Sequence, residues 1–161
     1  MSQHETPDRE RVLQIARDAR FAMVTSISAA GELHSRPMTP QLVDDDAVIW
    51  FLVADDAEQA TDIKVRPEVN VAFSESSSWL SIAGHAEVVY DRERIQEFWS
   101  AASEAWFPEG PDDPQLRVLK VRGVSAEYWA APGGRVATLI SFVKAKATGD
   151  TLDAENEEVD L

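Results

Sequence analysis

Apolar residues recur with two different periods along this chain, and each change of period marks a new element. The first period is helical and places on one face Val12, Ile15, Ala16 and Ala19. Thr6-Pro7 is typical of a helix start, with a hydroxyl cap followed by proline at the first helical position. From residue 21 the period becomes two, which predicts a strand over residues 21–27.

The next strand carries two prolines, which restrict where it can lie in a sheet. A turn at residues 29–32 leads into a returning strand over residues 34–42, and Pro37 and Pro40 fall inside it. Because proline cannot donate to a ladder, this strand is expected to be bulged or to lie at an edge. Edges and bulges are where sheets admit ligands.

The middle of the chain predicts a short helix after a buried strand. Residues 47–53 are almost fully apolar, which is typical of a buried strand. Asp55 or Asp56 is expected to cap a helix over residues 57–65, which Pro67 ends.

Two strands and a second short helix follow. Residues 69–73 alternate in polarity, and residues 79–90 predict a long strand in which Gly84 indicates a bulge. Asp91 is expected to cap the helix. The apolar face of this helix is predicted to hold Ile95, Phe98, Trp99 and Ala102.

The last third of the chain mixes a rigid loop, strands, a helix and an acidic end. Residues 107–114 predict a rigid polar loop, and residues 116–121 and 124–129 predict two strands. A turn at residues 132–134 precedes a final helix with Val136, Leu139, Ile140 and Val143 on its apolar face. Residues 150–161 hold six acidic residues and no basic one, which predicts a disordered tail.

These elements predict a single domain over residues 1–149 that is mainly β with α. Six or seven strands are expected, with helices at both ends and between strand groups. No βαβ repeat is present, which argues against a doubly wound parallel sheet. A compact antiparallel barrel with covering helices fits the pattern better.

Composition removes several classes of function. The chain has no cysteine, which excludes disulfides and thiolate chemistry, and its three histidines show no metal-ligand spacing, so no metal is expected. The net charge of −14 disfavours nucleic acid and anionic membranes as partners. No apolar run reaches the length of a membrane helix, and residues 1–8 lack a signal-peptide core, so a cytoplasmic protein is expected.

Common catalytic signatures are missing, but three local features could bind a ligand. Arg36 lies in the proline-interrupted strand and could offer its donor fork to a phosphate or carbonyl, or be an exposed charge. Residues 50–53 lead into a helix start that could attract phosphate, or are simply a core strand. Trp106 and Phe107 could form a wall for a flat ligand, or plug one end of the barrel.

The order of these features resembles the bacterial general stress proteins of the pyridoxamine 5'-phosphate oxidase-like superfamily, which are FMN-binding split barrels. The resemblance covers about residues 8–147. It rests on Arg-Pro-Met-Thr at 36–39, Ile-Trp-Phe-Leu at 49–52, Val-Asn-Val-Ala-Phe at 69–73, Ser-Ile-Ala-Gly at 81–84, Ala-Trp-Phe-Pro-Glu-Gly at 105–110, Asp-Pro at 113–114 and Glu-Tyr-Trp at 127–129.

The resemblance implies a six-stranded antiparallel split β-barrel that forms a homodimer, with a flavin at each subunit interface. FMN is the expected cofactor and FAD is an alternative. The residues implied to line the flavin are Arg36, Pro37, Met38, Thr39, Trp50, Phe51, Leu52, Val53, Gln59 and, from the second subunit, Trp106.

One departure weakens the expected phosphate site. Many superfamily members carry a Ser/Thr–Arg/His–Lys cluster where this chain has Ala57-Glu58-Gln59, so a carboxylate replaces a cation. Gln59 and the helix amides can still donate, and weak flavin binding is therefore expected. Oxidation of pyridoxamine phosphate is not expected, because the cations for two phosphates are missing.

Three functions remain open at this point. The first is a flavin-binding stress-response protein, and the second is a flavin-dependent oxidoreductase acting on an unknown small substrate. The third is a cofactor-free dimeric interaction module that kept the barrel and lost the site. Which residues would be catalytic stays unknown from the sequence.

Overall fold

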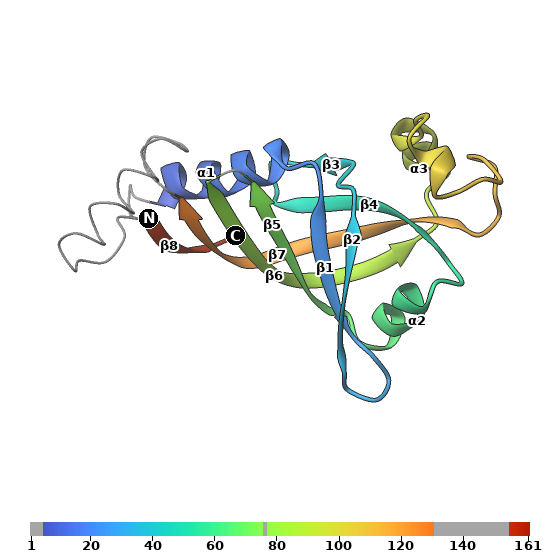
Figure 1. Ribbon diagram of the computed structural model, residues 1–161, viewed down its shortest axis with the longest axis horizontal. Helices are drawn as coiled ribbons and strands as arrows, with labels where there is room; N and C mark the ends of the chain where they lie inside the picture. The colour runs from blue at the N-terminus through green and yellow to red at the C-terminus, as the bar shows by residue number, and fades with distance from the viewer. Residues whose placement is uncertain (1–4, 76, 131–154) are drawn as a thin grey trace.

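The computed structural model describes residues 5–75, 77–130 and 155–161, which form one antiparallel sheet with three flanking helices (Figure 1). The strands are β1 (Ala22–Ile27), β2 (Leu33–Met38), β3 (Leu42–Val43), β4 (Val48–Ala54), β5 (Glu68–Glu75), β6 (Ser78–Val89), β7 (Leu116–Ala130) and β8 (Glu155–Asp160). The helices are α1 (Glu5–Asp18), α2 (Glu58–Val65) and α3 (Arg92–Phe98), with a 3-10 turn, η1 (Ser103–Ala105).

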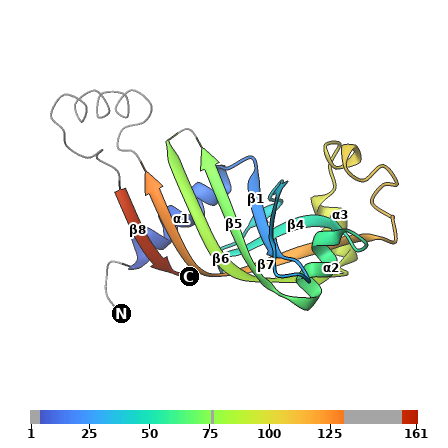
Figure 2. The ribbon, with the colours of Figure 1, turned by 60° about the horizontal axis from the view of Figure 1, so that its bottom comes forward.

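The sheet is open, with the strand order β2-β1-β5-β6-β7-β4-β3 and with β8 paired to β7 (Figure 2). The described residues hold eight strands where six or seven were expected. One reason is that the proline-containing segment divides: β2 ends at Met38, before Pro40, and β3 is a separate strand. The expectation of an edge strand is confirmed for Pro37, because β2 terminates the sheet, whereas Pro40 lies between β2 and β3 and in neither strand.

Strand β4 is buried on both faces, which explains its continuous apolar sequence. Ile49, Phe51 and Val53 belong to the main core, which also receives one face of α1. Val48, Trp50 and Leu52 belong to a second cluster that includes Ile95 and Phe98 of α3. The predicted apolar face is confirmed for Val12, Ile15 and Ala16 of α1, and Ala19 is buried as well but lies just beyond the end of the helix.

Strand β7 is one long strand rather than the two that were expected. Its first part pairs with β4 and its last part with β8, and both parts pair with β6. The register shifts at Gly84, which confirms the predicted bulge, and the extra residue Val124 lies on β7. A Cβ on Gly84 would collide with the backbone carbonyl of Arg122, so glycine is required there by close approach.

The expectation of a disordered acidic tail is wrong for Glu155–Asp160, which form β8 along the edge of β7. Val159 is buried in the main core and Leu161 packs against it. Two apolar anchors thus hold a segment whose charges lie on an edge strand, where charged side chains are common. The predicted turn at 132–134 and the helix after it lie outside the described residues.

The helix boundaries correct three expectations. Helix α1 already begins at Glu5, so Thr6 lies inside it. Helix α2 has Ala57 as its N-cap residue with no side-chain hydrogen bond, so neither preceding aspartate caps it. Asp91 does cap α3, accepting from the Arg94 amide, but α3 ends at Phe98, so Trp99 and Ala102 lie beyond it.

Candidate functional site

The predicted ligand-binding strand β2 lies at the open edge of the sheet and, among the described strands, pairs only with β1. Arg36 lies opposite Val24 and Pro37 opposite Met23. Met38 is partly buried against the main core, and Thr39 is exposed just after the strand. A proline is tolerated at position 37 because β2 is an edge strand.

Arg36 is brought to the start of α2. Its Nη2 donates to Glu58 Oε2 at 2.9 Å, while its Nη1 is buried and has no hydrogen-bond partner among the described residues. A buried guanidinium N–H without an acceptor is costly, and such atoms often mark the place of an absent ligand or water. The first amides of α2 are also without a side-chain cap. Together these groups form a set of donors suited to an oxyanion.

Gln59 does not join this set of donors through its side chain. It is 4% exposed, and its Nε2 donates to the Val24 carbonyl at a long 3.5 Å. Gln59 therefore ties α2 to β1, and only its backbone remains at the helix start.

The predicted β4 segment can meet a ligand only through its backbone. The reason is that its four side chains are all buried, those of Trp50, Phe51, Leu52 and Val53. The ring centroids of Trp50 and Phe98 are 6.3 Å apart, and the Arg94 guanidinium carbon lies 4.9 Å from the centroid of the Trp50 ring. Strand β3 pairs only with Ile49 and Trp50, so β4 has no described strand on that side from Phe51 onward. This free edge could offer backbone hydrogen bonds to a ligand.

Trp106 lies apart from the other predicted residues within one chain. It follows η1 and is 72% exposed. The α3 region and the loop after it are well separated from α2 and β2 (Figure 1). Trp106 therefore cannot be assigned to the Arg36 site of its own chain.

An apolar groove of about 370 Å³ crosses β1, β5, β6 and β7 beside β2. Its walls include Phe21, Met23 and Trp79, which are 54%, 42% and 44% exposed. The groove adjoins the predicted site, because Met23 is the register partner of Pro37. Sequence reasoning missed it because Phe21, Met23 and Trp79 were predicted only as members of strands, and a strand pattern does not show that side chains from several strands form one exposed groove.

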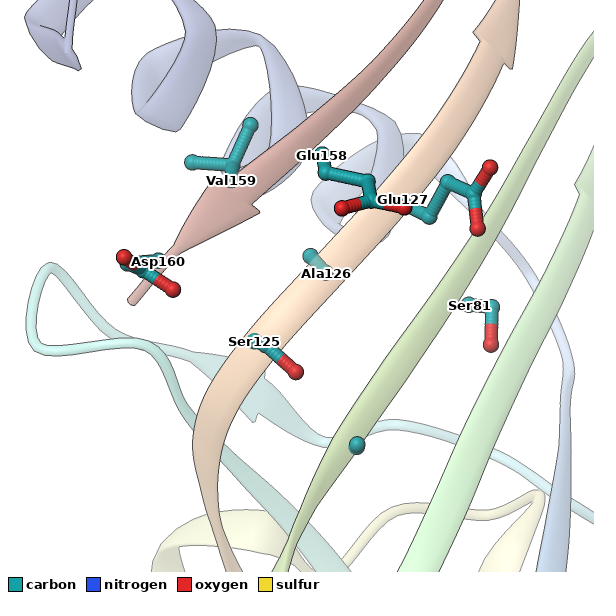
Figure 3. A pocket seen from close by; sticks show the side chains of 8 residues that line it. Ser81, Ser125, Ala126, Glu127, Glu158, Val159 and Asp160 are labelled. Carbon is teal, nitrogen blue, oxygen red and sulfur yellow. The ribbon is translucent and has the colours of Figure 1, made fainter.

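A second pocket, of about 500 Å³, lies over β6, β7 and β8 (Figure 3). Glu127 and Glu158 face each other across paired strands there, with Ser81, Ser125 and Asp160 nearby. These carboxylates would repel an anionic cofactor. None of the predicted site residues lines this pocket, so it is not the expected flavin site.

Sequence reasoning also missed a cluster of His34, Glu58 and Asp62. One ligand atom of each lies within 4.8 Å of the others. The histidines looked scattered because ligand spacing was sought along the chain. The available signal was that Glu58 and Asp62 are four apart on one helix, and His34 is two residues before Arg36 on one strand.

The open antiparallel sheet with flanking helices is consistent with the split-barrel class. Comparison with known families agrees, because the Pyridoxamine 5'-phosphate oxidase like family model matches residues 7–153. The chain belongs to this family, whose members commonly bind flavin.

Three similar proteins show how near the chain is to known members of this fold. Protein bli-3 of Neurospora crassa is 26% identical over 142 residues, which cover 81% of this chain and 68% of that protein. A crystal structure provisionally assigned as general stress protein 26 of Jannaschia sp. CCS1 has 29% identity and a TM-score of 0.78, covering 97% of this chain and 99% of that one. A heme binding protein from Mycobacterium smegmatis shares the fold alone, with 15% identity, a TM-score of 0.62 and coverage of 92% and 57%.

Among the described residues, none of the helices is long and apolar enough to span a membrane.

Proposed function

We propose that this chain is a flavin-binding protein that takes up FMN at β2 and the start of α2, with FAD as a weaker alternative. The observation that carries the proposal is the buried, unpartnered Nη1 of Arg36 beside the uncapped α2. A phosphate oxygen is the acceptor that this donor and the first helix amides fit best. The flavin supplies any redox chemistry, and the protein binds and orients it.

The isoalloxazine ring is expected to lie between β2 and the free edge of β4. Pro37 and Met38 follow Arg36 along β2, and Thr39 lies just after it. On β4, the carbonyls of Val48 and Trp50 accept from the β3 side, so by alternation the backbone of Leu52 faces the unpaired edge. Gln59 supports this arrangement indirectly, because its side chain donates to the Val24 carbonyl and so links α2 to β1.

Glu58 opposes phosphate binding at this site. Its carboxylate accepts from Arg36 at 2.9 Å and so competes directly with a phosphate for the same guanidinium. A charge-assisted hydrogen bond is worth about 1.5–3 kcal/mol, which is roughly one to two decades of affinity. The proposed protein is therefore a weak FMN binder compared with relatives that carry cations at this helix start.

A homodimer completes the site in this proposal. The exposed apolar groove beside β2 suits a second copy of the chain, because burial removes its apolar side chains from water. The second copy also supplies Trp106, which its own chain cannot bring to Arg36.

The proposal is tested by titrating tag-free, flavin-free protein with FMN and with riboflavin, which lacks the phosphate. Saturable quenching of flavin fluorescence is expected, with FMN bound about tenfold tighter than riboflavin. Arg36→Ala is expected to remove that difference. No saturable binding of FMN at hundreds of micromolar contradicts the proposal and leaves a cofactor-free dimeric module. NAD(P)H turnover above the free-flavin rate would add a flavin-dependent oxidoreductase activity.

A further inference from the structure

Three metal-ligating side chains converge beside the arginine site without having been assigned a role. His34 lies on β2, and Glu58 and Asp62 lie on α2. A ring nitrogen and two carboxylate oxygens from these residues lie within 4.8 Å of one another. The set combines two elements that are distant in sequence, so its convergence comes from the fold.

Both elements present their ligands by their regular periodicity. Glu58 and Asp62 are four residues apart, which places their side chains on the same face of α2, about one helical turn from each other. His34 is two residues before Arg36, and alternate residues of a strand share a face. The Arg36–Glu58 ion pair fixes that face of β2 toward α2.

Asp62 provides an independent sign that a cation belongs here. The residue is only 9% exposed, and its Oδ2 is buried with no hydrogen-bond partner among the described residues. A buried carboxylate is normally paired with a cation, hydrogen-bonded or bound to a metal. Arg36, the described cation in this cluster, donates to Glu58.

The ligand chemistry selects the class of ion. One imidazole with two carboxylates suits Zn²⁺ or Mn²⁺, whereas Mg²⁺ and Ca²⁺ prefer oxygen ligands alone. Ligands of a tetrahedral Zn²⁺ site lie about 3.4 Å apart, given bond lengths of about 2.1 Å. Glu58 can close the remaining gap, because its side chain is 69% exposed and free to turn from Arg36.

Glu32 adds a third carboxylate next to this cluster. Its Oε2 lies 3.5 Å from His34 Nε2. Carboxylates that accept from a ligating imidazole commonly orient it for the metal. The positive charge of Arg36 opposes metal binding, because the guanidinium already holds the Glu58 carboxylate. The metal affinity is therefore expected to be lower than it would be without Arg36.

We propose that His34, Glu58 and Asp62 bind one divalent transition-metal ion, Zn²⁺ or Mn²⁺, with water in the remaining positions. The site is separate from the donors proposed for the flavin phosphate, apart from Glu58, which borders both. Metal binding is therefore measurable in the absence of flavin, and either proposal can fail alone.

The test is calorimetric titration of the EDTA-treated, tag-free full chain with ZnCl₂ and, separately, with MnCl₂. One ion per chain is expected for at least one of the two metals. His34→Gln, Glu58→Gln and Asp62→Asn are each expected to weaken binding at least about tenfold, the lower limit seen even for outer-sphere partners. Asp56→Asn, an exposed change of equal charge two residues before Glu58, is expected to leave binding unchanged.

The acidic surface makes these variants decisive, because a net charge of −14 attracts cations weakly at many places. Binding that all three substitutions leave unchanged overturns the proposal, as does the absence of saturable binding of both ions. Asp62→Asn has a second readout, since it removes an unpaired buried charge. The melting temperature of this variant is expected to be higher than that of the wild type without metal, and to gain less from added metal.

Discussion

At the scale of single residues, Asp55 shows how charge holds the turn that carries the site. Its Oδ1 lies 2.6 Å from Lys64 Nζ and 3.6 Å from Arg117 Nε, and so links the end of β4 to α2 and β7. The hydrogen bond from Lys64, with the charges of Arg117 and Lys64, holds the pKa of the Asp55 carboxyl below its ordinary value, against partial burial, which raises it. The turn before Glu58 is therefore ordered by an ion pair rather than by a helix cap.

Asp55→Asn is predicted to lower the melting temperature at neutral pH by a small amount. A lowered folded-state pKa means that the ionised carboxylate stabilises the fold above the unfolded pKa of about 3.9. This contribution is lost as pH falls through the lower folded pKa. In thermal melts, the difference between wild type and variant should thus begin to shrink near about pH 4 and vanish only below the lowered pKa of the folded state.

Asp56→Asn is the control for this effect, since Asp56 is exposed and no described ion pair involves it. A deficit of Asp55→Asn that persists unchanged into strong acid would show that the ion pair is not its cause.

At the scale of elements, β8 shows how far composition alone can mislead. Residues 155–160 are rich in acid and read as disordered, yet they pair with β7 from Ser125 to Ala130. The signal that outweighs the charge is a single buried valine, Val159, at 8% exposure. A strand of this kind forms only where the edge of another strand, here β7, is free to pair with it. The local sequence of residues 155–160 does not indicate that such an edge is available.

Val159→Ala is predicted to destabilise the fold by about 1.5–2.5 kcal/mol, from lost burial plus a residual cavity. Glu157→Ala, at an exposed position of the same strand, is expected to change stability by less than about 0.5 kcal/mol. Urea denaturation measures both. Equal, negligible effects would mean that β8 does not hold to the sheet in solution.

Elements that bury a complete local pattern were predicted well, and those that depend on distant partners were not. The faces of α1 and β4 follow from periodicity and continuous apolarity, and the Gly84 bulge follows from one glycine. The capping of α2 was missed because two aspartates looked suitable, while Asp55 instead binds Lys64 and Arg117. Likewise, Arg36 and Glu58 are 22 residues apart, so their ion pair could not be read from spacing.

At the scale of the whole molecule, the proposed site depends on a second copy of the chain. Arg36 contacts Glu58 at the start of α2, whereas exposed Trp106 follows η1 in the segment after α3, and Figure 1 shows α3 well separated from α2. Of the exposed large apolar side chains, Phe21, Met23 and Trp79 share one groove beside β2. Covering that groove would remove the largest cost of leaving this face in water.

Phe21→Glu is predicted to shift the protein from dimer to monomer, because it places a charge in the proposed apolar contact. Leu33→Glu is the matched control: Leu33 is 72% exposed, at the far end of β2, and does not line the groove. Light scattering coupled to gel filtration reports the mass of each. A monomeric wild type, or a dimer that Phe21→Glu leaves intact, would contradict the proposed interface.

The central claim is that Arg36 at the start of α2 receives a flavin phosphate and that Glu58 competes for it. The measurement that tests it most directly is FMN affinity of Arg36→Ala and Glu58→Gln side by side in metal-free buffer. Opposite responses are predicted: about tenfold weaker binding without the guanidinium and about tenfold tighter binding without the carboxylate. If both variants bind FMN as the wild type does, the phosphate is not held at this site and the account is contradicted.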